Sequence, residues 1–295
     1  MLAAQSFVDP WRFEANVEVY LLVGFLVGAY IYMVRVIGPR AVPPGTPVVT
    51  RRHIGCFVIA MLVLFFASTW PIHQIGEEYL YSVHMVQHMM LSYFLPPLVW
   101  LATPEWLLRV LVGRGRLYRV VTFMAKPVVA AVVFNLMVMV LHIPGVVNTA
   151  PTSAPLHYLL HLAVVLTALL VWLPVVGPFP ELQMGYGAKM IYLFLLSVVP
   201  TVPAAWLTFA EDPVYSHYGE QPVRVWGMSP MEDQQLAAMV MKVVAGLYLW
   251  TLIVVMFFTR FGRDEPSLTY EAVTDAFDRS EAPTEPPRPS AGSKG

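Results

Sequence analysis

Residues 68–97 read STWPIHQIGEEYLYSVHMVQHMMLSYFLPP, a polar and aromatic lead-in that runs into an apolar segment. The apolar segment opens with His84 and His88, four residues apart. In a helix this spacing places both side chains on one face, one turn apart. Two such imidazoles can share a metal ion, or they can be ordinary polar residues at the end of a membrane helix. The rest of the chain is needed to weigh these two interpretations.

Composition indicates a membrane protein. The chain has 295 residues, of which 57% are hydrophobic and 13% are charged, whereas a soluble domain carries about 25% charged residues. A net charge of -1 and the lack of a basic patch give no reason to expect a nucleic-acid partner. The single cysteine, Cys56, excludes a disulfide framework and a thiolate metal cluster.

Long apolar runs predict an all-α polytopic bundle, because only helices and closed barrels cross a bilayer. The first run lacks a basic lead and a cleavage site, so we expect it to be a retained span and not a signal peptide. Seven transmembrane helices are expected, at about 17–36, 54–70, 84–102, 125–143, 157–176, 188–208 and 235–259. We divide the chain into an outside N-terminal segment (1–16), the transmembrane domain (17–260) and a cytoplasmic tail (261–295) that its composition predicts to be disordered.

Basic residues in the loops predict the orientation of the spans, because cytoplasmic loops are enriched in Lys and Arg. The second loop has the acids Glu77 and Glu78 and no Lys or Arg, and the fourth loop, 144–156, has no charged residue. The first and third loops are basic, with Arg35, Arg40, Arg51 and Arg52 in one, and Arg109, Arg114, Arg116, Arg119 and Lys126 in the other. This alternation predicts an N-terminus outside and a C-terminus in the cytoplasm.

The histidines gather on one side of this predicted topology. All of the eight except His53 lie at or beyond the outer ends of spans. Consecutive spans joined by short loops tend to pack side by side, so three adjacent helices would bring five imidazoles into one layer. Imidazole suits Zn, Cu, Fe and Ni, and polar groups at membrane depth tend to be functional. The predicted metal ligands are His84, His88, His142, His157 and His161.

Other polar residues on the same side are expected to support this site. Ser229 can cap the seventh span with Pro230 at its first position, which explains much of the segment 229–235. Asp233 could complete a metal shell or orient an imidazole, although an acid in the first turn of a helix is also favourable in itself. The predicted supporting residues are Asp233, Gln234, Gln87 and His73.

Several motifs in this order resemble the seven-span cytochrome c oxidase assembly proteins of the CtaG type, found in bacteria with haem-copper oxidases. The resemblance covers about residues 60–260. Its motifs are His84-Met-Val-Gln-His88, Pro96-Pro97, Ala102-Thr-Pro104, His142-Ile-Pro144 with Asn148, Leu156-His157-x-x-x-His161, Trp172-Leu-Pro174-Val-Val-Gly177-Pro178 and Met228-Ser-Pro-Met-Glu-Asp233-Gln234-Gln235.

This resemblance implies a non-enzymatic factor of the bacterial cytoplasmic membrane that handles copper for the metal centres of a haem-copper oxidase. It further implies that the partners are oxidase subunits, membrane lipid and a periplasmic or extracytoplasmic copper carrier.

Two other interpretations stay open at this point. A membrane haem protein could hold one haem between a histidine of the third span and one of the fifth. No span carries two histidines about four turns apart, the usual arrangement of transmembrane di-haem cytochromes. A metal transporter would need polar residues through the full depth of the bundle, and the inner halves of these spans are almost wholly apolar.

Overall fold

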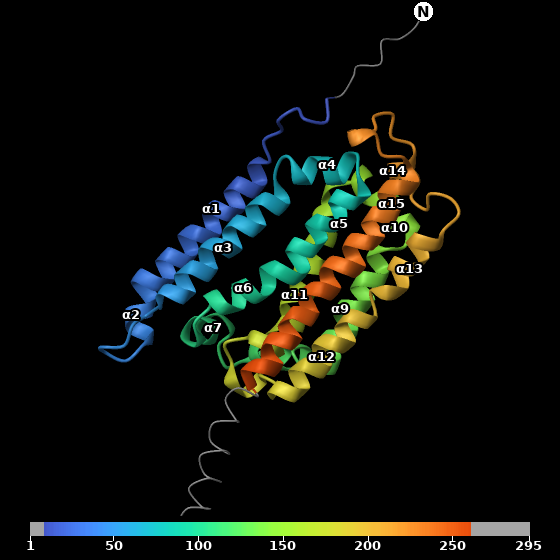
Figure 1. The fold of residues 1–295 in the computed structure, drawn as a ribbon. Coiled ribbons are helices and arrows are strands. Elements are labelled where there is room, and N and C mark those ends of the chain that lie inside the picture. The colour runs from blue at the N-terminus through green and yellow to red at the C-terminus, as the bar shows by residue number, and fades with distance from the viewer. Residues whose placement is uncertain (1–8, 261–295) are drawn as a thin grey trace, which may run out of the picture.

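The structure is a computed structural model and describes residues 9–260. In this part of the chain the regular elements are all helices, and Figure 1 shows them as one elongated bundle. The α-helices are α1 (Val17–Tyr32), α2 (Gly38–Ala41), α3 (Arg51–Ser68), α4 (Ile72–Glu78), α5 (Tyr81–Met89), α6 (Leu95–Ala102), α7 (Glu105–Val112), α8 (Arg116–Met124), α9 (Pro127–Leu141), α10 (Pro144–Thr149), α11 (Ala154–Val176), α12 (Tyr186–Val198), α13 (Thr201–Phe209), α14 (Ser216–Gly219) and α15 (Pro230–Met239).

Among the described residues, five helical segments are long and apolar enough to cross a membrane, and two bent helix pairs raise the number of spans to as many as seven. This confirms the prediction of an all-α membrane bundle. The five are Val17–Ala41, Arg51–Glu78, Ala154–Val176, Tyr186–Phe209 and Pro230–Arg260. The predicted tail, 261–295, lies outside the described residues, as do residues 1–8 of the N-terminal segment.

Several spans begin earlier than predicted, and in three of them polar residues that hydropathy does not count as membrane-spanning form the first turns. α3 begins at Arg51, where the Thr50 side chain accepts a hydrogen bond from the backbone N–H of His53. α15 begins at Pro230, where Ser229 and Glu232 form the reciprocal capping box. The predicted cap at Ser229 is therefore confirmed. α5 begins at Tyr81 instead of His84.

The prediction of a loop between the third and fourth spans is wrong in part, because most of residues 105–124 form the two helices α7 and α8. Each is sharply bent from the span beside it, α7 by 99° from Tyr81–Ala102 and α8 by 75° from α9. In α7, Leu107 and Leu108 are buried whereas Arg109 is exposed and paired with Glu105 at 2.7 Å. A one-sided apolar pattern of this kind is typical of a helix that lies along a surface.

The third span contains a π-helical turn, Met90–Phe94, between α5 and α6. In an α-helix the carbonyl of Ser92 would accept from residue 96, and in a π-helix from residue 97, but both are prolines without an N–H. Trp172 of α11 supplies the missing donor, with Nε1 3.0 Å from the Ser92 carbonyl oxygen. Because the proline pair leaves this carbonyl without a donor in its own helix, Trp172 can bond to it, and this hydrogen bond links the third span to the fifth.

One end of the bundle gathers α4, α10, α14 and the starts of α5, α11 and α15, whereas α2 and α7 lie at the opposite end (Figure 1). α4 lies against the first turn of α5, and Gly76 permits this close approach. A Cβ at Gly76 would lie 3.0 Å from the backbone nitrogen of His84 and 3.1 Å from its Cα. The carbonyl oxygen of Gly76 also accepts a hydrogen bond of 2.9 Å from the Tyr218 hydroxyl.

Replacing Gly76 with alanine is expected to destabilise the protein by about 1–3 kcal/mol, because the added methyl group meets backbone atoms that cannot move aside. Thermal unfolding in detergent measures this as a lower melting temperature. Gly55→Ala is the matched control, since a Cβ at this α3 position meets nothing within 4 Å and alanine favours the helix. Equal melting temperatures for the two variants would contradict the close α4–α5 contact.

Candidate metal centre

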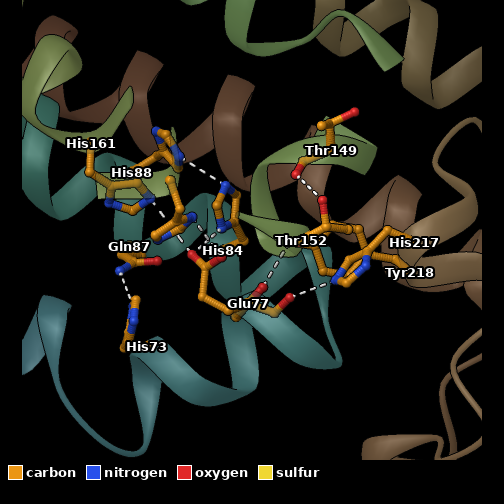
Figure 2. A network of polar contacts seen from close by, with 12 residues as sticks. His73, Glu77, His84, Gln87, His88, Thr149, Thr152, His161, His217 and Tyr218 are labelled. Atoms are coloured by element: carbon orange, nitrogen blue, oxygen red, sulfur yellow. Dashed lines mark hydrogen bonds and ion pairs between the residues drawn. The ribbon is translucent and has the colours of Figure 1, made fainter. Parts of the chain in front are cut away.

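Three histidines from two helices converge at the end of the bundle. His84 and His88 project from α5, and His161 faces them from α11 (Figure 2). The Nε2 atoms of His84 and His88 are 2.9 Å apart, and the ring centroids of His88 and His161 are separated by 5.2 Å. One ring nitrogen from each of the three lies within 4.8 Å of the others. The three side chains can therefore bind the same small ion.

Glu77 of α4 places a carboxylate in the middle of these imidazoles. Its Oε1 lies 3.2 Å from His84 Nδ1, and its Oε2 lies 3.1 Å from His157 Nδ1. His161 Nε2 approaches the same Oε1 at 3.6 Å. Only 12% of the Glu77 side chain is exposed, so a negative charge on this carboxylate must be stabilised by the neighbouring histidines. Glu77 is the site residue that the sequence analysis missed, since it was counted only as a loop acid.

Several ring nitrogens at this end of the bundle lack a hydrogen-bond partner in the described part of the chain. They include Nε2 of His157 and Nε2 of His161, both buried. Buried polar atoms are normally paired with protein, water or an ion. A cavity of about 30 Å³ is lined by Glu77, His84, His88, His157 and His161, among other residues, which is room for an ion or a water molecule.

His142 stands apart from the other four predicted ligands. It follows the last turn of α9, and its Nδ1 lies 2.7 Å from the carbonyl oxygen of Val138. A second cavity, also of about 30 Å³, is lined by His142 and by His88. The structure thus groups His84, His88, His157 and His161 around Glu77 and places His142 at the neighbouring cavity.

The predicted supporting residues hold the site's helices in place. The Asp233 carboxylate accepts hydrogen bonds from the backbone N–H groups of Tyr81 and Ser82 at 2.8 and 2.9 Å. It therefore caps the first turn of α5, where a negative charge is favourable, and fixes the turn that carries His84. Gln234 joins two other segments, because its Oε1 accepts from the N–H of Val214 and its Nε2 donates to the carbonyl of Leu207.

Gln87 and His73 form a polar pair beside Glu77. Gln87 is fully buried, and its Nε2 lies 3.1 Å from His73 Nδ1. The His73 ring lies 5.6 Å from that of His157, between centroids. Together with Glu77, these two histidines make a second group whose possible ligand atoms all lie within 4.8 Å of one another.

The loop that carries α14 holds α4 from the other side. His217 Nε2 lies 2.8 Å from the backbone oxygen of Glu77, and the Tyr218 hydroxyl donates to Gly76. Burial raises the pKa of the Tyr218 hydroxyl well above its usual range, with Glu77 and Asp233 as further contributors. Tyr218 therefore stays protonated and keeps donating. Neither contact is visible in the sequence, because each joins residues about 140 positions apart.

The fold and the site define a helical membrane protein with a cluster of histidines around a buried carboxylate at one end of its bundle. The chain matches the model of the cytochrome c oxidase caa3 assembly factors (Caa3_CtaG) over residues 28–262, and it belongs to this family. The match confirms the resemblance and extends it toward the N-terminus from the expected start near residue 60. No curated protein and no solved structure was found that matches this chain.

Asp233→Ala is expected to unfold the first turn of α5, because it leaves the N–H groups of Tyr81 and Ser82 without an acceptor. Loss of such a cap costs about 1–2 kcal/mol. Hydrogen–deuterium exchange in detergent should show faster exchange over residues 81–88, with Asp233→Asn intermediate. Glu232→Gln is the control, since its exposed side chain can still accept from Ser229. Unchanged exchange in Asp233→Ala would contradict the capping role.

Proposed function

We propose that this protein binds copper ions at His84, His88 and His161 and supplies them during assembly of a caa3-type cytochrome c oxidase. The observation that carries the proposal is the convergence of the three imidazoles beside a cavity of about 30 Å³, where the buried His161 Nε2 has no hydrogen-bond partner in the described chain and only an ion-pair contact of 3.6 Å with Glu77 Oε1. Membership of the assembly-factor family supports the oxidase as the destination. In this role the protein is a carrier of its cargo and not an enzyme.

The donor set fits copper. Imidazole nitrogens bind Cu and Zn well, and bond lengths of about 2.0–2.1 Å put two ligand nitrogens about 3 Å apart. The 2.9 Å between Nε2 of His84 and Nε2 of His88 agrees with that spacing. A shared ion would also relieve the close approach of these two nitrogens, since without an ion one of them must carry a proton toward the other. Among these metals, the oxidase as destination favours copper.

We further propose that the histidine end faces the outside of a bacterial cytoplasmic membrane. The basic residues Arg40, Arg51 and Arg109 lie in or beside α2, α3 and α7 at the opposite end of the bundle, as a cytoplasmic face requires (Figure 1). Copper would then arrive from outside, from a soluble copper carrier, and leave toward oxidase subunits in the same membrane.

The cavity favours an ion over a haem. A haem held between the third and fifth spans would need a slot of several hundred cubic ångströms between α5 and α11, the usual size of a cofactor pocket. The cavity that contacts His84, His88 and His161 has about 30 Å³. The side chains that would be axial ligands therefore leave room for a small ion or a water molecule, and not for a porphyrin ring.

Copper analysis of the purified protein tests the proposal, using protein without a polyhistidine tag. The double variant His88→Ala, His161→Ala should bind copper at least about tenfold more weakly than the wild type, because two of three ligands are lost. His53→Ala is the control, since His53 caps α3 at the opposite end of the bundle. Wild-type copper affinity in the double variant would overturn the site.

Labelling with a membrane-impermeant maleimide tests the orientation. In a Cys56→Ser background, Thr152→Cys at the histidine end should be labelled in intact cells, since Thr152 is exposed. Arg114→Cys, exposed between α7 and α8, should react only after the membrane is permeabilised. The reverse pattern would show that the histidines face the cytoplasm.

A further inference from the structure

Beside the three histidines of the proposed copper site lies the second group, made of His73, Glu77 and His157. The two groups share no residue, and they meet at the carboxylate of Glu77. One oxygen of Glu77 approaches His84 and the other approaches His157. The question is whether these residues form one site or two.

The two ring nitrogens of His84 indicate that there are two sites. Nε2 points to His88, and Nδ1 points to Glu77 Oε1. The two nitrogens cannot bind the same ion, because they lie on opposite sides of the ring. A ligating imidazole usually donates its other N–H to a carboxylate, which orients the ring and strengthens its nitrogen as a ligand. Glu77 Oε1, 3.2 Å from His84 Nδ1, is placed to serve as this acceptor when the first site holds an ion.

Glu77 Oε2 remains available on the other side. It lies 3.1 Å from His157 Nδ1, and the His73 ring completes the group. Gln87 can prepare His73 as a ligand. Its buried Oε1 has no hydrogen-bond partner among the described residues, and turning its amide over would let Oε1 accept from His73 Nδ1–H. His73 Nε2 would then be bare and free to bind an ion.

We propose that His73, Glu77 and His157 form a second metal site, for a divalent first-row ion such as Cu²⁺, and that Glu77 couples it to the first. This inference rests on the proposed function of the neighbouring site. Two nitrogens and a carboxylate oxygen make a harder donor set than three imidazoles, which favours a divalent ion. Under this assignment, Glu77 serves both sites with different oxygen atoms.

An ion bound at the second site is expected to weaken the binding of an ion at the first. A cation held by Glu77 Oε2 draws negative charge away from Oε1, which weakens the carboxylate's support of His84. The two cations also repel each other across a partly buried site. Filling the second site therefore lowers the affinity of the first. An arriving ion would help to release the ion already bound.

The helices place the second site nearer the end of the bundle. His157 lies one turn closer to the start of α11 than His161, a rise of about 6 Å. His73 and Glu77 belong to α4, which lies across that end of the bundle (Figure 1). An ion entering from that end would meet the second site first. The His84–His88–His161 site lies deeper.

Equilibrium dialysis with Cu²⁺, on the full chain in detergent and without a polyhistidine tag, tests the second site. We expect two ions per chain, the second bound roughly tenfold more weakly than the first. Electron paramagnetic resonance should show the single-ion signal broaden as the second equivalent binds, because the two spins lie close together. His73→Ala should bind one ion and keep the narrow signal.

Three further variants separate ligand loss from misfolding. His73→Gln keeps a polar partner for Gln87 and should also bind one ion. Glu77→Gln should lose the second ion and bind the first more weakly. His53→Ala is the control, since His53 caps α3 at the opposite end of the bundle and its loss should leave two ions bound.

The possible failures are distinguishable. One ion in the wild type, with His73→Ala unchanged, would overturn the second site and leave the proposed function standing. Two ions whose signal never broadens would overturn the assignment of the second ion to this cluster. A wild type that binds no copper at all would overturn the proposed function and this inference together.

Discussion

The carboxylate of Glu77 is buried at one end of the helix bundle, and a charge in such a place needs partners. Its oxygens face His84, His157 and His161, and the geometry around them depends on keeping α4 against α5. Gly76 allows the approach, Tyr218 and His217 hold the backbone of α4, and Asp233 fixes the first turn of α5. Segments far apart in the chain therefore meet around one acidic side chain.

Much of the scaffold could be predicted from the sequence, because its signals are local. Long apolar runs gave the spans, and Ser229 with Pro230 marked the start of α15. The spacing of His84 and His88, repeated by His157 and His161, predicted that these side chains would share a helix face within each pair. That they also face each other across two helices depends on the packing of α5 against α11, which the sequence indicated only through the expectation that neighbouring spans pack side by side.

What could not be predicted depends on contacts between distant segments or on the rotation of a single side chain. Glu77 stands in a polar stretch that looked like a loop, and only the turn of the chain after α3 brings it over the histidines. Asp233 occupies the first turn of its own helix yet caps another. His142 reaches the predicted layer, but it lines the neighbouring cavity, with its Nδ1 beside the carbonyl of Val138.

The π-helical turn Met90–Phe94 determines the direction in which His84 and His88 project relative to the rest of their span. Such a turn holds one residue more than an α-helical turn, and each residue of an α-helix rotates the chain by about 100°. If the same residues were wound as a regular α-helix, His84 and His88 would be turned about a quarter-turn away from His161. The extra residue and the wider winding therefore belong together. An insertion or deletion between His88 and the proline pair keeps the histidines facing His161 only if the winding of this turn changes with it.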